Sequence, residues 1–179
     1  MNDVYLILGS NIEKEHNLPT AVALLRDMVE VVAVSSIYET VPVGLKGQAN
    51  FWNTAVHLQT PLSATQLKTE VLAVIEQKLK RVRQADKNAP RTIDLDIVLF
   101  NEDVLDYDGG DGRSRHIPDP DLLKFTHVAV PIAELAPTMP HPETAEPLSA
   151  IATRLHNPAH LWHVQSLNLP ISKSASHQE

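Results

Sequence analysis

The stretch RTIDLDIVLF occupies residues 91–100 and is the most informative segment of the sequence. Its branched apolar residues alternate with acidic ones, and this alternation predicts a β-strand. Side chains two positions apart on a strand point to the same face of the sheet. We therefore expect Asp94 and Asp96 to share one face, while the other face carries their apolar neighbours Ile93, Leu95 and Ile97.

The sequence before this strand predicts three further strands. Residues 3–9 (DVYLILG) form a short apolar run that ends in glycine, which is typical of a buried strand. Residues 30–38 (EVVAVSSIY) are rich in β-branched side chains, which favour strands. In residues 51–59 (FWNTAVHLQ), successive side chains fall into two alternating sets, as on the two faces of a strand. The connection between them contains proline and glycines and is too long for a tight hairpin, so an exposed loop is expected.

Two helices are predicted between these strands. Apolar residues recur at helical spacing from Leu18 to Met28 and again from Leu67 to Leu79, and Ser63 with Gln66 has capping-box spacing. The order strand, helix, strand, strand, helix, strand is the pattern of ferredoxin-like folds. We expect an α+β sandwich with a ferredoxin-like βαββαβ core, in which helices cover the faces of an antiparallel sheet. The two predicted helices should lie on the same face of this sheet, and further elements should follow at the C-terminus.

Signals for regular structure weaken after residue 100. The turn-forming stretch DYDGGDGRSR at 106–115 and the many prolines that follow predict irregular structure. Residues 132–136 and 147–155 are candidates for short helices. The length of 179 residues suits one domain, which we place at residues 1–168, with a flexible tail at 169–179.

Composition excludes several classes of protein. The chain has no cysteine, so disulfide and thiolate chemistry are excluded, and we expect a reducing, cytoplasmic location. A formal charge of −7 argues against nucleic-acid binding, and no apolar run is long enough to predict a membrane span. The sequence also lacks a GxxxxGK[ST] loop and the HExxH spacing of zinc hydrolases.

The acidic pair on the predicted strand has two interpretations. Paired carboxylates suit Mg²⁺, particularly when substrate phosphates complete its coordination. An exposed strand face that happens to be acidic is the alternative, and spacing alone does not decide between them.

A basic cluster just before the strand favours the metal interpretation. Six of the fifteen cationic side chains lie within residues 78–91. Arginine presents donors that match phosphate oxygens, and cations beside a two-carboxylate metal site suit a nucleoside triphosphate. Favourable interaction with a helix C-terminus would explain the cations up to Arg83, but it explains Arg91 poorly.

Taken together, these motifs closely resemble the 6-hydroxymethyl-7,8-dihydropterin pyrophosphokinases of folate biosynthesis. RTIDLDIVLF matches the family signature PRTxDLDxxLF, and the likeness continues through LGSN at 8–11, SSIYETVPVG at 35–44, RVR at 81–83 and PIAELAP at 131–137. The resemblance implies a ferredoxin-like fold. It also implies transfer of the β,γ-diphosphate of ATP to the 6-hydroxymethyl group of the reduced pterin, with release of AMP, in tetrahydrofolate biosynthesis.

The resemblance also implies roles for individual residues. Asp94 and Asp96 would hold two Mg²⁺ ions, and Arg81 and Arg91 would act with them as catalytic residues that grip the phosphates. The nucleotide would be contacted by Glu76, Arg81, Arg83, Lys87, Arg91 and Ile97. The pterin would be contacted by Thr40, Pro42, Val43, Phe51, Asn53 and His127.

The resemblance further implies that ATP and the reduced pterin are the small-molecule substrates. We expect a monomer that binds neither nucleic acid nor membrane. The loops at 41–50 and 84–91 should be mobile lids that keep water from an activated phosphoryl group.

Two segments depart from the family pattern. In PDPDLLKFTHVAVPIAELAP, His127 replaces an expected phenylalanine, Phe125 an arginine and Asp119 a histidine. In QADKNAP at 84–90, Lys87 and Asn88 replace a basic residue and an aromatic one. These departures keep an alternative open: a catalytically weak paralogue that binds pterin or nucleotide, or one that acts on a modified pterin.

Overall fold

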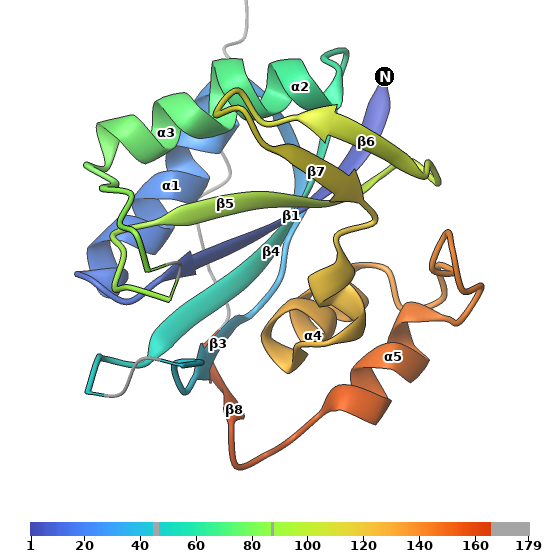
Figure 1. The fold of residues 1–179 in the computed structure, drawn as a ribbon. Helices are drawn as coiled ribbons and strands as arrows, with labels where there is room; N and C mark the ends of the chain where they lie inside the picture. Colours follow the sequence, from blue (N-terminus) through green and yellow to red (C-terminus); the bar gives the residue numbers. More distant parts are fainter. Residues whose placement is uncertain (45–46, 87, 166–179) are drawn as a thin grey trace, which may run out of the picture.

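The computed structural model describes residues 1–44, 47–86 and 88–165. Its centre is a six-stranded antiparallel sheet in which the order β5-β1-β4-β3-β8 is joined by β2, paired to β4 (Figure 1). The strands are β1 (Asn2–Ser10), β2 (Glu30–Val34), β3 (Ile37–Thr40), β4 (Phe51–Thr60), β5 (Asp94–Phe100) and β8 (Leu161–Gln165). This arrangement confirms the predicted ferredoxin-like α+β fold.

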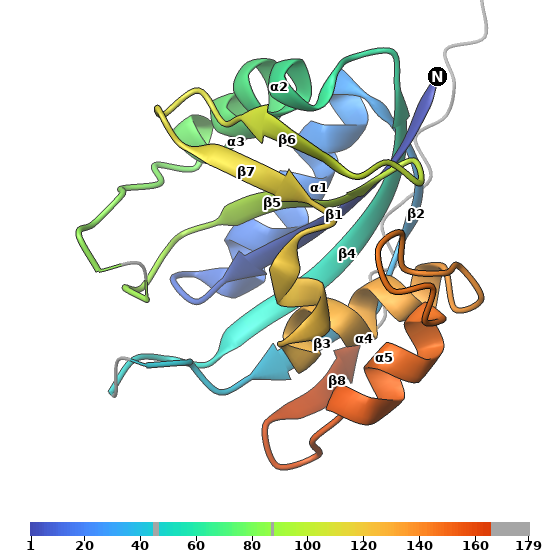
Figure 2. The same ribbon diagram turned by 45° about the vertical axis from the view of Figure 1, so that its right-hand side comes forward.

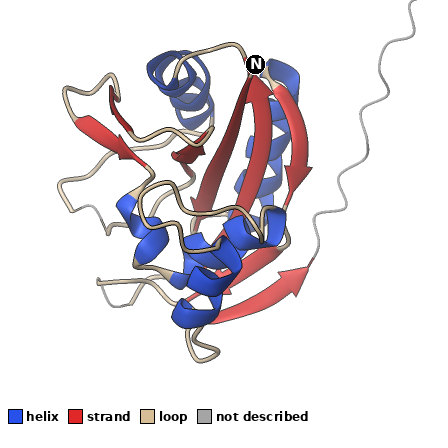
Figure 3. Cartoon of the chain, turned by 90° about the vertical axis from the view of Figure 1, so that its right-hand side faces the viewer, coloured by secondary structure: helices blue, strands red, loops and turns tan. Residues whose placement is uncertain are grey.

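Helices cover both faces of the sheet (Figure 3). The first face carries α1 (Lys14–Met28) and a second, composite helix made of α2 (Ala64–Gln66), a π-helical segment (Leu67–Leu72) and α3 (Ala73–Lys78). The opposite face carries α4 (Thr126–Leu135), which follows a short 3₁₀ turn (Pro120–Leu123), and α5 (Leu148–Leu155). Each face therefore has its own apolar core.

The alternation of β1 and β5 separates these cores. Leu6 and Leu95 are fully buried beneath α1 and the composite helix, whereas Ile7 packs on the side of α4. Burying such side chains on both faces contributes most of the stabilisation of a fold of this kind. Ile93, directly before β5, and Leu95 and Ile97 on β5 all belong to the first core, so Asp94 and Asp96 face the side of α4, as the alternation predicts.

Two predicted segments differ from the structure. The strand expected at 30–38 is divided into β2 and β3 at Ser35, whose hydroxyl accepts a hydrogen bond from the Ala55 amide of β4. The irregular structure expected at 106–115 is wrong, because this stretch forms a hairpin of β6 (Leu105–Asp108) and β7 (Ser114–Ile117) (Figure 2). Its turn uses Gly110 and Gly112 with φ values of +78° and +75°, a conformation that glycine adopts without strain.

The ends of the fold agree with the sequence only in part. The candidate helices at 132–136 and 147–155 correspond to α4 and α5, although α4 begins six residues earlier, at Thr126. The flexible tail predicted at 169–179 lies outside the described residues, and the single-domain assignment stays a prediction. Within the described ranges, no helix is long and apolar enough to cross a membrane.

The capping box at Ser63 predicts that this serine stabilises the start of the composite helix. Ser63 Oγ accepts from the Gln66 amide at 3.2 Å, and Gln66 Oε1 accepts from the Ser63 amide at 3.1 Å. Ser63→Ala should lower the free energy of unfolding by about 1 kcal/mol, as loss of a serine cap does. Urea denaturation measures this change. Ser149→Ala, in the exposed first turn of α5, is the control, and equal losses in the two variants would contradict a specific capping role.

Candidate active site

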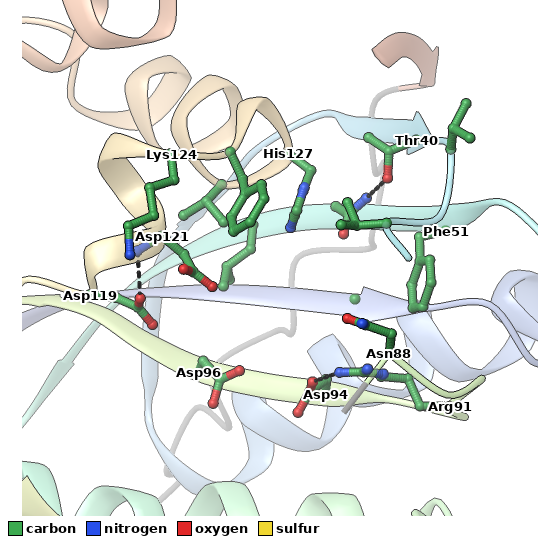
Figure 4. Close-up of a pocket in the computed structure, with 17 residues that line it drawn as sticks. Thr40, Phe51, Asn88, Arg91, Asp94, Asp96, Asp119, Asp121, Lys124 and His127 are labelled. Carbon is green, nitrogen blue, oxygen red and sulfur yellow. Dashed lines mark hydrogen bonds and ion pairs between the residues drawn. The ribbon is translucent and has the colours of Figure 1, made fainter. Parts of the chain in front are cut away.

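Asp94 and Asp96 line a cavity of about 560 Å³ between β5 and the start of α4 (Figure 4). Gly9 of β1 forms part of its floor, and Phe51 of β4 and His127 of α4 project into it. Eight residues assigned to the site by resemblance line this cavity: Thr40, Val43, Phe51, Asn53, Arg91, Asp94, Asp96 and His127.

Arginines compensate the charge of Asp94. Arg91 Nη1 donates a hydrogen bond to Asp94 Oδ2, and Arg81 Nη2 lies 4.0 Å from the same oxygen. Burial, followed by the charge of Asp96, raises the pKa of Asp94 despite these arginines. Arg81 does not line the cavity, but its Nε is buried without a hydrogen-bond partner among the described residues. The acid pair thus lies beside a donor that an anion would satisfy.

Asp96 is held by Lys68, which the sequence analysis missed. Lys68 Nζ lies 3.2 Å from Asp96 Oδ1, and the lysine is only 1% exposed. Burial alone would raise the pKa of Asp96, but the charge of Lys68 and its hydrogen bond outweigh burial and lower the pKa. The available signal was a lysine at a position where the helical spacing from Ala64 to Val71 predicts an apolar, buried side chain.

Several residues assigned to the nucleotide or the pterin do not line this cavity. Glu76 is buried, accepts a hydrogen bond from the Leu95 amide and pairs with Arg83 at 3.1 Å, so its carboxylate supports β5 and does not line the cavity. Arg83 also lies outside the cavity lining. The Ile97 side chain is 1% exposed and belongs to the first apolar core, because β5 alternates, so it does not line the cavity. Pro42 does not line the cavity, and Lys87 lies outside the described residues.

The part of the cavity lined by Gly9, Phe51 and Asn53 is suited to a flat, polar ring. Asn53, which is 4% exposed, donates to Thr40 Oγ1 at 2.8 Å. A side chain on Gly9 would meet Asn53 Oδ1 at 3.2 Å, so glycine keeps this space open. The Phe51 ring faces the Arg91 guanidinium, which lies 5.7 Å from the ring centroid.

His127, in the first turn of α4, and Phe125, directly before the helix, form one wall of the cavity. Their rings stack with centroids 5.3 Å apart, and both line the cavity. Burial lowers the pKa of His127, so its imidazole is uncharged at neutral pH. The expected phenylalanine is thus replaced by a neutral heteroaromatic ring, and the expected arginine by an apolar one.

The remaining wall of the cavity is acidic. Of its residues, the sequence analysis names only Asp119, as a departure from the family pattern. Asp119 and Asp121 line the cavity, with Lys124 beside them. Burial raises the pKa of Asp119 to about 6. Four carboxylates but only two cationic side chains, Arg91 and Lys124, are therefore found among the described lining residues.

The two predicted lid loops meet beside Arg91. Gln48 Nε2 donates to the Asn88 carbonyl at 2.9 Å, and Asn11 Nδ2 donates to Gln48 Oε1 at 2.9 Å. Asn11 Oδ1 also accepts from the Arg91 amide at 2.8 Å. Asn11, from the LGSN motif, therefore joins both loops to the start of the acidic strand. The predicted mobility of the loops stays a prediction.

The donor set is suited to a cation that brings ligands of its own. Within the described ranges, no group of three or more His, Cys, Asp or Glu side chains is arranged to hold a metal. Asp94 Oδ1 and Asp96 Oδ2 accept no hydrogen bond from any described residue, so each carboxylate keeps one oxygen available. Mg²⁺ is commonly bound by one or two carboxylates together with water and substrate phosphates, which this pair fits.

Comparisons with known structures agree with the observed fold. The chain is similar to wild-type HPPK-DHPS from Plasmodium falciparum, with a TM-score of 0.69 at 13% identity. The match covers 86% of this chain but only 44% of that one. A likeness at this identity shows the fold alone.

Comparisons of sequence identify the family. The family model for 7,8-dihydro-6-hydroxymethylpterin-pyrophosphokinase matches residues 5–137. The 2-amino-4-hydroxy-6-hydroxymethyldihydropteridine pyrophosphokinase of Bacillus subtilis is 42% identical over 139 residues, which cover 75% of this chain and 79% of that protein. The protein of the same name from Aquifex aeolicus is 31% identical over 83% of this chain and 89% of its own length. The chain therefore belongs to the 7,8-dihydro-6-hydroxymethylpterin-pyrophosphokinase family.

Proposed function

We propose that this pyrophosphokinase transfers the β,γ-diphosphate of ATP to the 6-hydroxymethyl oxygen of 6-hydroxymethyl-7,8-dihydropterin at the site built on Asp94 and Asp96. The observation that carries the proposal is the position of the acid pair. The pair lines the same cavity as Phe51, Asn53 and His127. Carboxylates for a metal and a slot for a flat ring thus occupy one space.

At the phosphate end, Asp94 and Asp96 would hold Mg²⁺, and we propose two ions. The excess of carboxylates in the lining supports this, because a triphosphate would be repelled without added positive charge. When bound, Mg²⁺ neutralises charge that develops at the transferred phosphoryl group. Arg91 lines the cavity beside Asp94, where it would exchange its carboxylate partner for a phosphate oxygen.

Other cations would complete the phosphate site. The unpartnered Nε of Arg81 supports a phosphate contact there, since a buried donor without an acceptor is costly. Roles for Arg83 and Lys87 rest on the resemblance. Glu76 would act indirectly, by holding the Leu95 amide and therefore the position of β5.

At the pterin end, the ring would lie against Phe51 and His127. Aromatic side chains favour stacked or edge-on contacts with a flat heterocycle. Asn53 and the segment from Thr40 to Val43 would bind its polar edge, with Asn53 oriented by the Thr40 hydroxyl. An imidazole buries less surface than a phenyl ring, so we expect weaker ring binding than a phenylalanine at 127 would give.

A second candidate function is favoured by the α4 wall. Phe125 stacks on His127 in place of a cationic side chain, so one phosphate contact expected from the family is missing. A catalytically weak paralogue that binds pterin or nucleotide, or an enzyme for a modified pterin, would fit this change. We also propose a monomer. A cytoplasmic location likewise stays a proposal.

The reaction itself is the first test. Incubation with ATP, Mg²⁺ and 6-hydroxymethyl-7,8-dihydropterin should release AMP and form the pterin diphosphate, because the donor set suits diphosphate transfer. Chromatography of the nucleotides measures this outcome. Formation of ADP would overturn the assigned reaction. Tight pterin binding by calorimetry with a non-hydrolysable ATP analogue, but no turnover, would favour the weak paralogue.

The acid pair can be tested by Asp96→Asn, which keeps an oxygen able to accept from Lys68. Its turnover number should fall at least about a hundredfold, or ~2.7 kcal/mol of activation free energy, because a metal ligand is neutralised. The melting temperature should change little. Asp106→Asn, on the exposed hairpin, is the matched control. Near-normal turnover of Asp96→Asn would remove Asp96 from the mechanism.

Asp119 predicts a pH dependence of stability. Its pKa is about 6 in the fold and about 4 in an unfolded chain, so the folded state loses stability as pH rises from about 4 through 6. Asp119→Asn should therefore raise the free energy of unfolding more at pH 7.5 than at pH 4.5. Urea denaturation at both pH values measures this, with Asp27→Asn on α1 as the control. An equal effect at both pH values would show that Asp119 is not perturbed.

A further inference from the structure

Lys68 occupies an unusual position behind the acid pair. Its Nζ donates a hydrogen bond to the Leu95 carbonyl and lies 3.2 Å from Asp96 Oδ1 and 3.5 Å from Glu76 Oε1. The three ammonium hydrogens thus have three acceptors, two of which carry negative charge. Burial of this charge requires such compensation, because an unpaired buried ammonium is costly.

The local helix geometry is also unusual at this residue. Lys68 lies in the π-helical segment Leu67–Leu72, and its own carbonyl accepts from the Ala73 amide, five residues later. Single π-helical turns occur frequently at functional sites, where the extra residue changes the direction of a side chain. Here Lys68 reaches past β5, which is an edge strand, to the carboxylate that faces the cavity.

Among the acids near Lys68, Asp96 depends most on this lysine for a compensating positive charge. Glu76 has a second cation, since Arg83 Nη2 lies 3.1 Å from its other oxygen. Asp94 is paired with Arg91 and Arg81. Asp96, in contrast, pairs with no cation other than Lys68 among the described residues. Removing the lysine charge would therefore leave Asp96 with only the more distant charges of Arg83 and Arg115.

We propose that Lys68 is a resident cation that neutralises Asp96 before any metal binds, and so makes metal binding at the acid pair depend on the nucleotide. The inference rests on the proposed function, because it takes Asp94 and Asp96 as metal ligands. A positive charge bound to one oxygen of Asp96 opposes a divalent cation at the other. The phosphates of ATP add negative charge that offsets this opposition, so the metal binds well only with the nucleotide.

The same lysine also positions Asp96. By binding Oδ1, Lys68 leaves Oδ2 as the oxygen available to the cavity and disfavours metal binding through both oxygens at once. A purely structural lysine would act differently: its loss would lower stability without tightening metal binding. The affinity for metal alone therefore separates the two roles.

The test measures Mn²⁺ binding by electron paramagnetic resonance, with and without α,β-methylene-ATP. For Lys68→Met, affinity for Mn²⁺ alone should rise about tenfold, and affinity in the presence of the analogue should change less than about threefold. Lys14→Met is the control, because Lys14 pairs with Glu39 at 3.5 Å outside the cavity. Wild-type or weaker affinity of Lys68→Met for Mn²⁺ alone would overturn the proposal.

Further variants keep the test decisive if Lys68→Met does not fold or if Asp96 is not a metal ligand. If Lys68→Met does not fold, Lys68→Gln, which keeps a donor without the charge, should show the same tightening; Lys68→Arg, which keeps the charge, should resemble the wild type. Wild-type affinity in Lys68→Gln would overturn the proposal. Asp96→Asn tests the metal site separately. If it binds Mn²⁺ with the analogue as tightly as the wild type does, the assignment of Asp96 as a ligand fails, and the role of Lys68 fails with it.

Discussion

The site depends on keeping two like-charged, half-buried carboxylates close together. Asp94 and Asp96 are neighbours on one face of β5 only because a strand repeats every two residues. Their mutual repulsion is offset by cations from separate parts of the chain: Arg91 just before β5, Arg81 after α3, and Lys68 from the π-helical segment. The fold is thus what brings these charges together, and the ferredoxin-like order is what makes β5 an accessible edge.

The same arrangement links the two ends of the cavity. Asn11, directly after β1, accepts a hydrogen bond from the Arg91 amide and donates one to Gln48, so both loops are connected to the acidic strand. Phe51 faces the Arg91 guanidinium from the pterin end. A substitution of Arg91 would therefore alter both the phosphate site and the ring slot.

The features of the fold and the site that depend on local sequence could be predicted from the sequence. The periodicity of β5 fixes the face of Asp94 and Asp96, and the spacing of Ser63 and Gln66 fixes a helix start, because both are local properties. Lys68 could not be assigned to Asp96, since the two residues are 28 positions apart and only the tertiary fold brings them together. The hairpin at β6 and β7 was missed because its glycines predict a turn but not the strands beside it. The place of Glu76, in support of β5, likewise depends on a long-range contact with the Leu95 amide.

Anomalous diffraction tests the central claim most directly: that Asp94 and Asp96 together bind the metal that accompanies the transferred diphosphate. In a crystal grown with Mn²⁺, α,β-methylene-ATP and the pterin, an anomalous peak should lie within about 2.2 Å of one oxygen of each carboxylate and also contact phosphate oxygens. A peak elsewhere in the cavity, with Asp94 and Asp96 bound only to Arg91 and Lys68, would contradict it.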